Sequence, residues 1–117
     1  MPKVLLVDDD APHTRITRLR LEKAGFHVEI SNRSYGVLNL IAASQPDVVL
    51  LDMEMPGLNG LELLDLLRED DELARTRVVF YSGMAETELR ARAEATGTAF
   101  AHKMGEFTQL LQVLRAA

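Results

Sequence analysis

The chain has 117 residues, a formal net charge of −5 and no cysteine. This length suits one domain over residues 1–117, so we expect no cleft between two domains. The lack of cysteine excludes disulfides, thiolate metal sites and a cysteine nucleophile, and the acidic balance argues against direct nucleic-acid binding, which needs a basic surface. The longest apolar runs are far shorter than the roughly 20 residues of a membrane span, and Met1–Val7 lacks the pattern of a signal peptide. We therefore expect a soluble, cytoplasmic protein that contacts neither a membrane nor nucleic acid.

Short apolar runs alternate with longer amphipathic stretches along the chain. Five of these runs predict β-strands: Val4–Val7, His27–Ser31, Val48–Leu51, Val78–Tyr81 and Thr98–Ala101. The first, third and fourth are rich in Val and Leu without polar alternation, as in strands covered on both faces. The second and fifth are weaker, as edge strands often are. Strands that alternate with helices predict an α/β fold with a mostly parallel sheet, right-handed crossovers and helices on both faces.

The stretches between the strands predict five helices. Asp10 before Ala11-Pro12 indicates a helix start, with the aspartate as N-cap and proline in the first turn. The other helices are marked by Val37, Leu40 and Ile41; by Leu61, Leu64 and Leu67 with Asn59 as N-cap; by the stretch Met84–Thr96; and by Phe107, Leu110, Leu111 and Leu114. Gly25 and Gly97 lie where the first and fourth helices would stop.

The helix expected over Met84–Thr96 has an unusually weak apolar face. That face offers Leu89 and otherwise small side chains, namely Ala85, Ala93 and Ala95. Two charge pairs at i, i+4 stabilise such a helix by about 0.2–0.5 kcal/mol each; they are Glu86 with Arg90 and Glu88 with Arg92. We therefore expect this helix to be held less firmly than its neighbours.

Polar side chains follow four of the predicted strands. They are Asp8, Asp9 and Asp10 after the first, Asp52 and Glu54 after the third, Ser82 after the fourth, and His102 and Lys103 after the fifth. Ligands of an open parallel sheet bind beyond the carboxyl ends of its strands, so these residues predict a site. All of them except His102 have an ordinary alternative role: Asp10 and Ser82 as helix caps, Asp8 and Asp9 as caps or solvated side chains, Asp52 as a turn former, Lys103 as a surface charge, and Glu54 with an exposed side chain.

The chemistry of this set favours phosphoryl transfer. Carboxylates gathered in one place raise each other's pKa unless a cation lies among them. Oxygen ligands without cysteine select a hard cation, Mg²⁺, with Mn²⁺ as the alternative ion. A lysine beside such an ion suits a phosphoryl oxygen, and a hydroxyl and backbone amides supply further donors. A Gly-x-x-x-x-Gly-Lys loop is absent from the sequence, so a nucleotide is not the implied ligand.

From Lys3 to about Arg115 the chain resembles the receiver domains of two-component response regulators, including stand-alone chemotaxis regulators. Four stretches carry the resemblance: Val4–Asp10, Pro46–Gly60, Val78–Gly83 and Ala99–Lys103. The resemblance implies a flavodoxin-like, doubly wound sheet of five parallel strands in the order 2-1-3-4-5, flanked by five helices. It also implies a single receiver domain, stand-alone or cut from a longer regulator, that acts as a phosphorelay switch and not as a turnover enzyme.

The resemblance implies roles for the acidic residues. Asp52 would be the phosphoacceptor, taking the phosphoryl group of a phosphohistidine on a sensor histidine kinase or a phosphotransfer protein. Asp9 and Asp52 would hold Mg²⁺ directly, together with the backbone carbonyl of Glu54. Asp8 would act on the ion mainly through water.

Three further residues would carry the switch. Lys103 would pair with the phosphoryl group, and Ser82 would donate its hydroxyl to a phosphoryl oxygen. Phe100 would turn inward as the switch aromatic, with an ordinary core role as the alternative. The output surface would combine the fourth helix, the fifth strand and the last helix, and would bind a downstream protein or, after phosphorylation, a second copy of the chain.

One departure from the family leaves alternatives open. Met104 follows Lys103 where the family usually has proline with a cis bond, and a non-proline cis bond costs about 2.5–4 kcal/mol. A trans bond with a shifted loop is therefore one alternative, and it favours a degenerate receiver that binds proteins without phosphorylation. Another alternative is a Mg²⁺-dependent phosphohydrolase, but Asp52-Met53-Glu54 lacks the Asp-x-Asp that such enzymes need.

Overall fold

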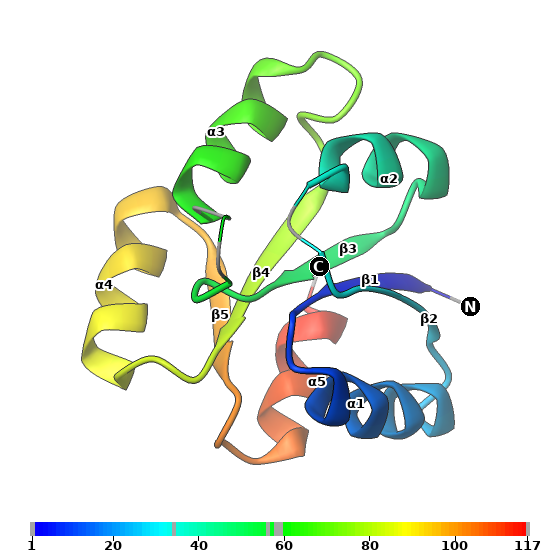
Figure 1. Ribbon diagram of the computed structural model, residues 1–117. Coiled ribbons are helices and arrows are strands. Elements are labelled where there is room, and N and C mark those ends of the chain that lie inside the picture. Colours follow the sequence, from blue (N-terminus) through cyan, green and yellow to red (C-terminus); the bar gives the residue numbers. More distant parts are fainter. Residues whose placement is uncertain (1, 34, 56, 58–59, 117) are drawn as a thin grey trace.

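The protein is described by a computed structural model that covers residues 2–33, 35–55, 57 and 60–116. Strands and helices alternate along the described chain (Figure 1). The strands are β1 (Lys3–Val7), β2 (His27–Ser31), β3 (Val48–Leu51), β4 (Arg77–Ser82) and β5 (Ala99–His102). The helices are α1 (Ala11–Lys23), α2 (Val37–Ser44), α3 (Gly60–Glu69), α4 (Glu86–Thr96) and α5 (Phe107–Arg115). All strand pairs are parallel and the order is β2-β1-β3-β4-β5, which confirms the predicted fold class.

The sheet separates two layers of helices. Successive side chains of a strand point to opposite faces, so each central strand contributes to two cores. Leu5 and Phe80 pack beneath α2, α3 and α4, whereas Leu6 and Leu50 pack against α1 and α5 on the other face (Figure 1). All four of these side chains are fully buried. The two weaker predicted strands, β2 and β5, lie at the edges of the sheet, as expected.

Helix α1 begins as the sequence predicts. Asp10 is the N-cap, and its side chain accepts a hydrogen bond from the His13 backbone N–H at 3.1 Å. Pro12 lies in the first turn, where its missing N–H costs no hydrogen bond. The cap therefore starts α1 directly after the acidic residues that follow β1.

Replacing Asp10 with alanine is expected to lower the free energy of unfolding by about 1 kcal/mol, because the first turn of α1 loses its acceptor. Urea denaturation measures this change. Asp10→Asn removes the same charge but keeps a capping oxygen, so it should retain most of the stability. An asparagine variant as unstable as the alanine variant would refute the capping role.

Helix α4 has an even narrower buried face than the sequence predicts. Leu89 and Ala93 are its buried residues, whereas Ala85 and Ala95 are exposed. The prediction was wrong for these two alanines. Ala85 is the N-cap and precedes the first turn, and Ala95 lies nearly opposite the buried Ala93, about 200° around a helix of about 3.6 residues per turn. The predicted charge pairs are confirmed, with N–O distances of 3.2 Å for Arg90–Glu86 and 2.9 Å for Arg92–Glu88.

The predicted ends of two helices are also confirmed. Gly25 and Gly97 follow α1 and α4 with φ angles of 98° and 64°, which glycine adopts readily because it has no Cβ. The predicted N-cap of α3, Asn59, lies outside the described residues. None of the helices in the described part of the chain combines the length and the apolar character of a membrane span.

Candidate functional site

The carboxyl ends of β1 and β3 bring the acidic residues together. The two strands are neighbours, with Val7 opposite Leu51, and the Asp52 N–H donates to the Val7 carbonyl at 3.0 Å. Asp8 and Asp52 therefore follow adjacent strands at the same level. Carboxylate oxygens of Asp8, Asp9 and Asp52 all lie within 4.8 Å of one another. These three residues form what we call the acidic cluster.

Backbone N–H groups orient the two buried carboxylates of the acidic cluster. Asp8 is 1% exposed and Asp52 is 4% exposed, whereas Asp9 faces solvent. The Asp10 N–H donates to Asp8 Oδ1 and the Glu54 N–H donates to Asp52 Oδ1, each at 3.0 Å. Each carboxylate thus keeps its Oδ2 atom for another partner.

Lys103 is that partner for both carboxylates. Its Nζ lies 2.6 Å from Asp8 Oδ2 and 3.1 Å from Asp52 Oδ2. Burial acts to lower the pKa of Lys103, but the close interactions with the carboxylates of Asp8 and Asp52 outweigh burial and raise it. The ammonium group is therefore held in its charged form between the two aspartates.

The methionine after Lys103 does not displace the lysine. The described residues contain no cis peptide bond, so the Lys103–Met104 bond is trans. Met104 is 85% exposed, and Lys103 still reaches both aspartates. The degenerate receiver was favoured by Met104 alone, so this alternative has no support from the geometry.

The acidic cluster has the donor set of a hard divalent cation. Burial raises the pKa of Asp8 even though Lys103 opposes this shift, so the ionised cluster is electrostatically strained. Asp8 Oδ2 has no well-aligned hydrogen-bond partner among the described residues and depends on its ion pair with Lys103. The Lys103 ammonium pairs with two of the three carboxylates of the acidic cluster, and a divalent ion would neutralise the remaining charge. These residues fit Mg²⁺ or Mn²⁺.

Ser82 ends β4 at the margin of the cluster and is fully buried. Its Oγ accepts a hydrogen bond from the Met84 N–H at 3.2 Å and donates to Glu54 Oε1 at 3.4 Å. Ser82 is not the cap of α4, because Ala85 occupies that position. Glu54 is exposed, as expected for its side chain, yet it contacts the Ser82 hydroxyl.

Phe100 lies in the middle of β5. It is half-buried against the core beneath α4, and the Arg90 guanidinium lies 5.2 Å from its ring centroid. It also borders a groove of about 650 Å³ between α4, β5 and α5. The switch role of Phe100 stays a prediction.

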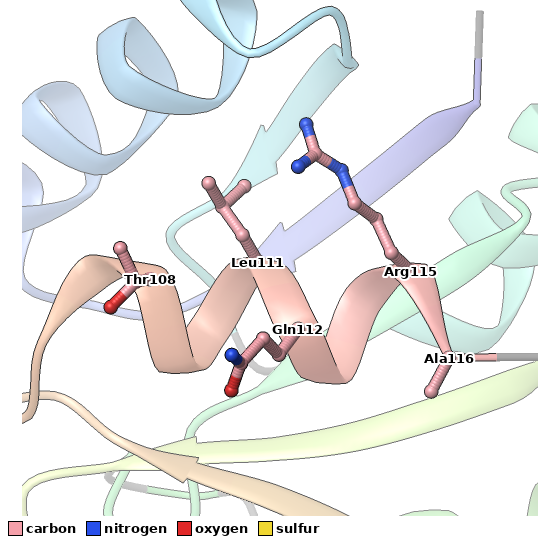
Figure 2. A pocket seen from close by; sticks show the side chains of 5 residues that line it. All are labelled: Thr108, Leu111, Gln112, Arg115 and Ala116. Atoms are coloured by element: carbon pink, nitrogen blue, oxygen red, sulfur yellow. The ribbon is translucent and has the colours of Figure 1, made fainter.

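A further groove of about 500 Å³ runs along α5. Its lining residues are Thr108, Leu111, Gln112, Arg115 and Ala116, and Figure 2 shows their side chains spread along this helix and its end. The residues of the acidic cluster line neither groove. The site is marked here by its charges and hydrogen bonds.

Asn32 had no place in the sequence interpretation, and His102 was named there only among the polar residues that follow the strands, without a role of its own. Asn32 donates from Nδ2 to the Asp8 carbonyl at 2.7 Å, a long-range contact that no sequence pattern signals. His102 bonds to the Met84 carbonyl and to the Met104 N–H, at 2.7 Å and 3.0 Å. Its position directly before Lys103 was the available signal.

Comparison with known proteins relates the chain to one family. The model of the response regulator receiver domain matches residues 4–115. The polar-differentiation response regulator DivK of Brucella anthropi is 30% identical over 86 residues, which are 73% of this chain and 70% of DivK. The phosphate regulon transcriptional regulatory protein PhoB of Rhizobium meliloti is 31% identical over 97 residues, which are 83% of this chain but only 43% of PhoB.

A solved structure extends the similarity to the whole fold. The chemotaxis protein CheY4 of Vibrio cholerae superposes with a TM-score of 0.84 at 26% identity, covering 98% of this chain and 97% of CheY4. By sequence and by fold, the chain belongs to the response regulator receiver domain family.

Proposed function

We propose that this receiver domain is a phospho-accepting switch in which Asp52 takes a phosphoryl group from a phosphohistidine in a Mg²⁺-dependent reaction. Receiver domains are regulatory switches that histidine kinases or phosphotransfer proteins phosphorylate. The observation that carries the proposal is the meeting of Asp9, Asp52 and Lys103 at one end of the sheet. This arrangement offers a nucleophile, a cation site and a fixed positive charge in one place.

In the proposed reaction, a carboxylate oxygen of Asp52 forms a bond to phosphorus. The P–N bond of the phosphohistidine breaks, and its electron pair stays on the imidazole of the partner. Asp52 is buried and already oriented by the Glu54 N–H, so it has little conformational freedom to lose on reacting. The reaction thus transfers the group without an external oxidant or reductant.

The remaining residues stabilise the transferred group. Asp9, Asp52 and the Glu54 backbone would hold Mg²⁺, and Asp8 would act on the ion through water. The ion would neutralise the phosphoryl charge. Lys103 pairs with a phosphoryl oxygen after leaving Asp52, and its raised pKa keeps it charged. Ser82 turns its hydroxyl from Glu54 Oε1 to the phosphoryl group.

The proposed output surface is formed by α4, β5 and α5, with Phe100 as its switch residue. Leu89 and Ala93 are the buried residues of α4, so a small change beneath this helix can move it. The downstream partner is a protein, and a phosphorylation-dependent second copy of the chain is a further candidate. Receiver domains are typically cytoplasmic, and we extend that location to this chain.

Intact-mass measurement with acetyl phosphate and Mg²⁺ tests the proposal. The wild-type protein is expected to gain a single labile phosphate, and chelation of Mg²⁺ should prevent the gain. Asp52→Ala should gain none, whereas Asp65→Ala, which changes an exposed aspartate of α3, should behave like the wild type. Phosphate on the Asp52→Ala protein, or no phosphate from either acetyl phosphate or a phosphorylated histidine kinase, would refute the function.

A further inference from the structure

His102 lies between the two loops that carry Ser82 and Lys103. It is the last residue of β5, directly before Lys103, and it pairs in register with Ser82 at the end of β4. The imidazole is half-buried, so protein groups and not bulk water alone surround it. A side chain in this position can contact both loops.

The imidazole makes one hydrogen bond to each loop. Nε2 lies 2.7 Å from the carbonyl oxygen of Met84, which can only accept, so Nε2 carries the hydrogen. The Met104 N–H donates to Nδ1 at 3.0 Å, so Nδ1 carries none. The two contacts together assign the neutral Nε2–H tautomer to His102.

Both ends of this bridge connect to groups of the phosphorylation site. On one side, the Met84 N–H donates to Ser82 Oγ at 3.2 Å. On the other side, the Gly105 N–H donates to the His102 carbonyl at 2.9 Å and closes the turn after β5. The Lys103 N–H donates to the Ser82 carbonyl, also at 2.9 Å. The ring therefore closes a network that runs from the Ser82 hydroxyl to the backbone of Lys103.

We propose that His102 is a positioning residue that locks the Ser82 loop to the Lys103 loop, so that the hydroxyl and the ammonium group are held together for the phosphoryl group. The turn that carries Lys103 contains Met104 and Gly105, and neither residue restricts the backbone as proline does. The two bonds of the imidazole supply that restriction instead. This role rests on the proposed function of the site, because it concerns the geometry that receives the phosphoryl group.

Three substitutions separate the two bonds. His102→Leu removes both. His102→Asn keeps an acceptor near the place of Nδ1 for the Met104 N–H, and His102→Gln keeps an N–H donor that reaches toward the Met84 carbonyl. The rate of phosphorylation by acetyl phosphate should fall about five- to tenfold in His102→Leu, as expected for the loss of positioning hydrogen bonds. The asparagine and glutamine variants should each recover part of this loss.

The matched control is His27→Leu, which makes the same chemical change at an exposed residue where β2 begins and should leave the rate unchanged. If His102 acted by packing alone, the leucine variant would be phosphorylated faster than the asparagine variant. Partial recovery of the phosphorylation rate by the polar variants therefore distinguishes a positioning role from a packing role. A His102→Leu protein that is phosphorylated at the wild-type rate would overturn the proposal. Asparagine and glutamine variants as slow as the leucine variant would do the same.

A second measurement does not depend on phosphorylation. Nitrogen-15 NMR of the wild-type protein is expected to show the Nε2–H tautomer of His102, and His102→Leu should shift the amide signals of Met84 and Met104 together with that of Lys103. If the wild type accepts no phosphate but shows these signals, the proposed function fails and the His102 bridge stands. An Nδ1–H tautomer, or amide shifts confined to β5, would overturn the bridge whatever the phosphorylation result.

Discussion

Replacement of Lys103 by methionine is expected to lower the free energy of unfolding by about 3 kcal/mol at neutral pH without Mg²⁺, because it leaves buried carboxylates without their cation. Asp8 and Asp52 are almost fully buried, and the Lys103 ammonium contacts Oδ2 of both. Methionine retains most of the apolar stem but not the charge. Urea denaturation with and without Mg²⁺ measures the effect, and Mg²⁺ should restore part of the loss.

The pH range of this measurement follows from the pKa of Lys103. Because the pKa is raised in the folded protein, the stabilisation is complete below the ordinary value of 10.5 and is lost only as pH rises through the raised value. The effect is therefore fully expressed at pH 7. At strongly alkaline pH the stabilities of the wild type and the Lys103→Met variant should converge.

Two variants control the Lys103 experiment. Lys23→Met removes an exposed positive charge at the end of α1 and should change stability little. Adding Asp8→Asn to the Lys103→Met protein removes one uncompensated carboxylate, so the double variant should be more stable than the single variant. If Lys103→Met unfolds at the same urea concentration as the wild type, the lysine does not hold the acidic cluster together.

Addition of Mg²⁺ is expected to raise the melting temperature, because an ion that binds only the folded state stabilises it by mass action. At an ion concentration 100 times the dissociation constant, the gain is about 2.7 kcal/mol. The gain has two sources in this chain: new metal–oxygen bonds and relief of the repulsion among Asp8, Asp9 and Asp52. Differential scanning calorimetry over a Mg²⁺ titration measures it.

Asp9→Asn should blunt this gain, because Asp9 is the exposed member of the acidic cluster and its loss removes a ligand without disturbing the buried ion pairs. Asp71→Asn, which neutralises an exposed aspartate after α3, should keep the full gain. Sodium chloride at equal ionic strength controls for screening. A melting temperature indifferent to millimolar Mg²⁺ would show that the metal site is wrong.

Much of the fold could be predicted from local patterns. Runs such as Val48–Leu51 are uniformly apolar because both faces of β3 are covered, and this pattern gave its limits correctly. The N-cap Asp10 and the helix end at Gly97 depend on backbone chemistry within a few residues, so they were also predicted correctly. The exposed positions of Ala85 and Ala95 were not, because the buried side of α4 depends on where the helix begins and how it docks.

The sequence predicted that Asp8, Asp9, Asp52 and Lys103 follow strand ends at one edge of the sheet, but it did not predict their contacts. A carboxylate at the end of a strand suggests a site, but strand register decides that Asp8 and Asp52 meet. The place of Lys103 stayed open because Met104 follows it. The backbone bond from the Lys103 N–H to the Ser82 carbonyl and the His102 bridge, both formed between β4 and β5, fit its placement beside the aspartates.

The sequence by itself determined the α/β class, the strand order through its family resemblance, and the residue types gathered at the carboxyl end of the sheet. The class and the gathered residue types arise from periodicity, turn chemistry and motifs that extend over few residues. Only the tertiary structure decided that the Lys103 ammonium lies between Asp8 and Asp52, that Glu54 contacts Ser82, and that His102 joins the two loops. Such contacts depend on the packing of segments far apart in the chain, and no local pattern encodes those distances.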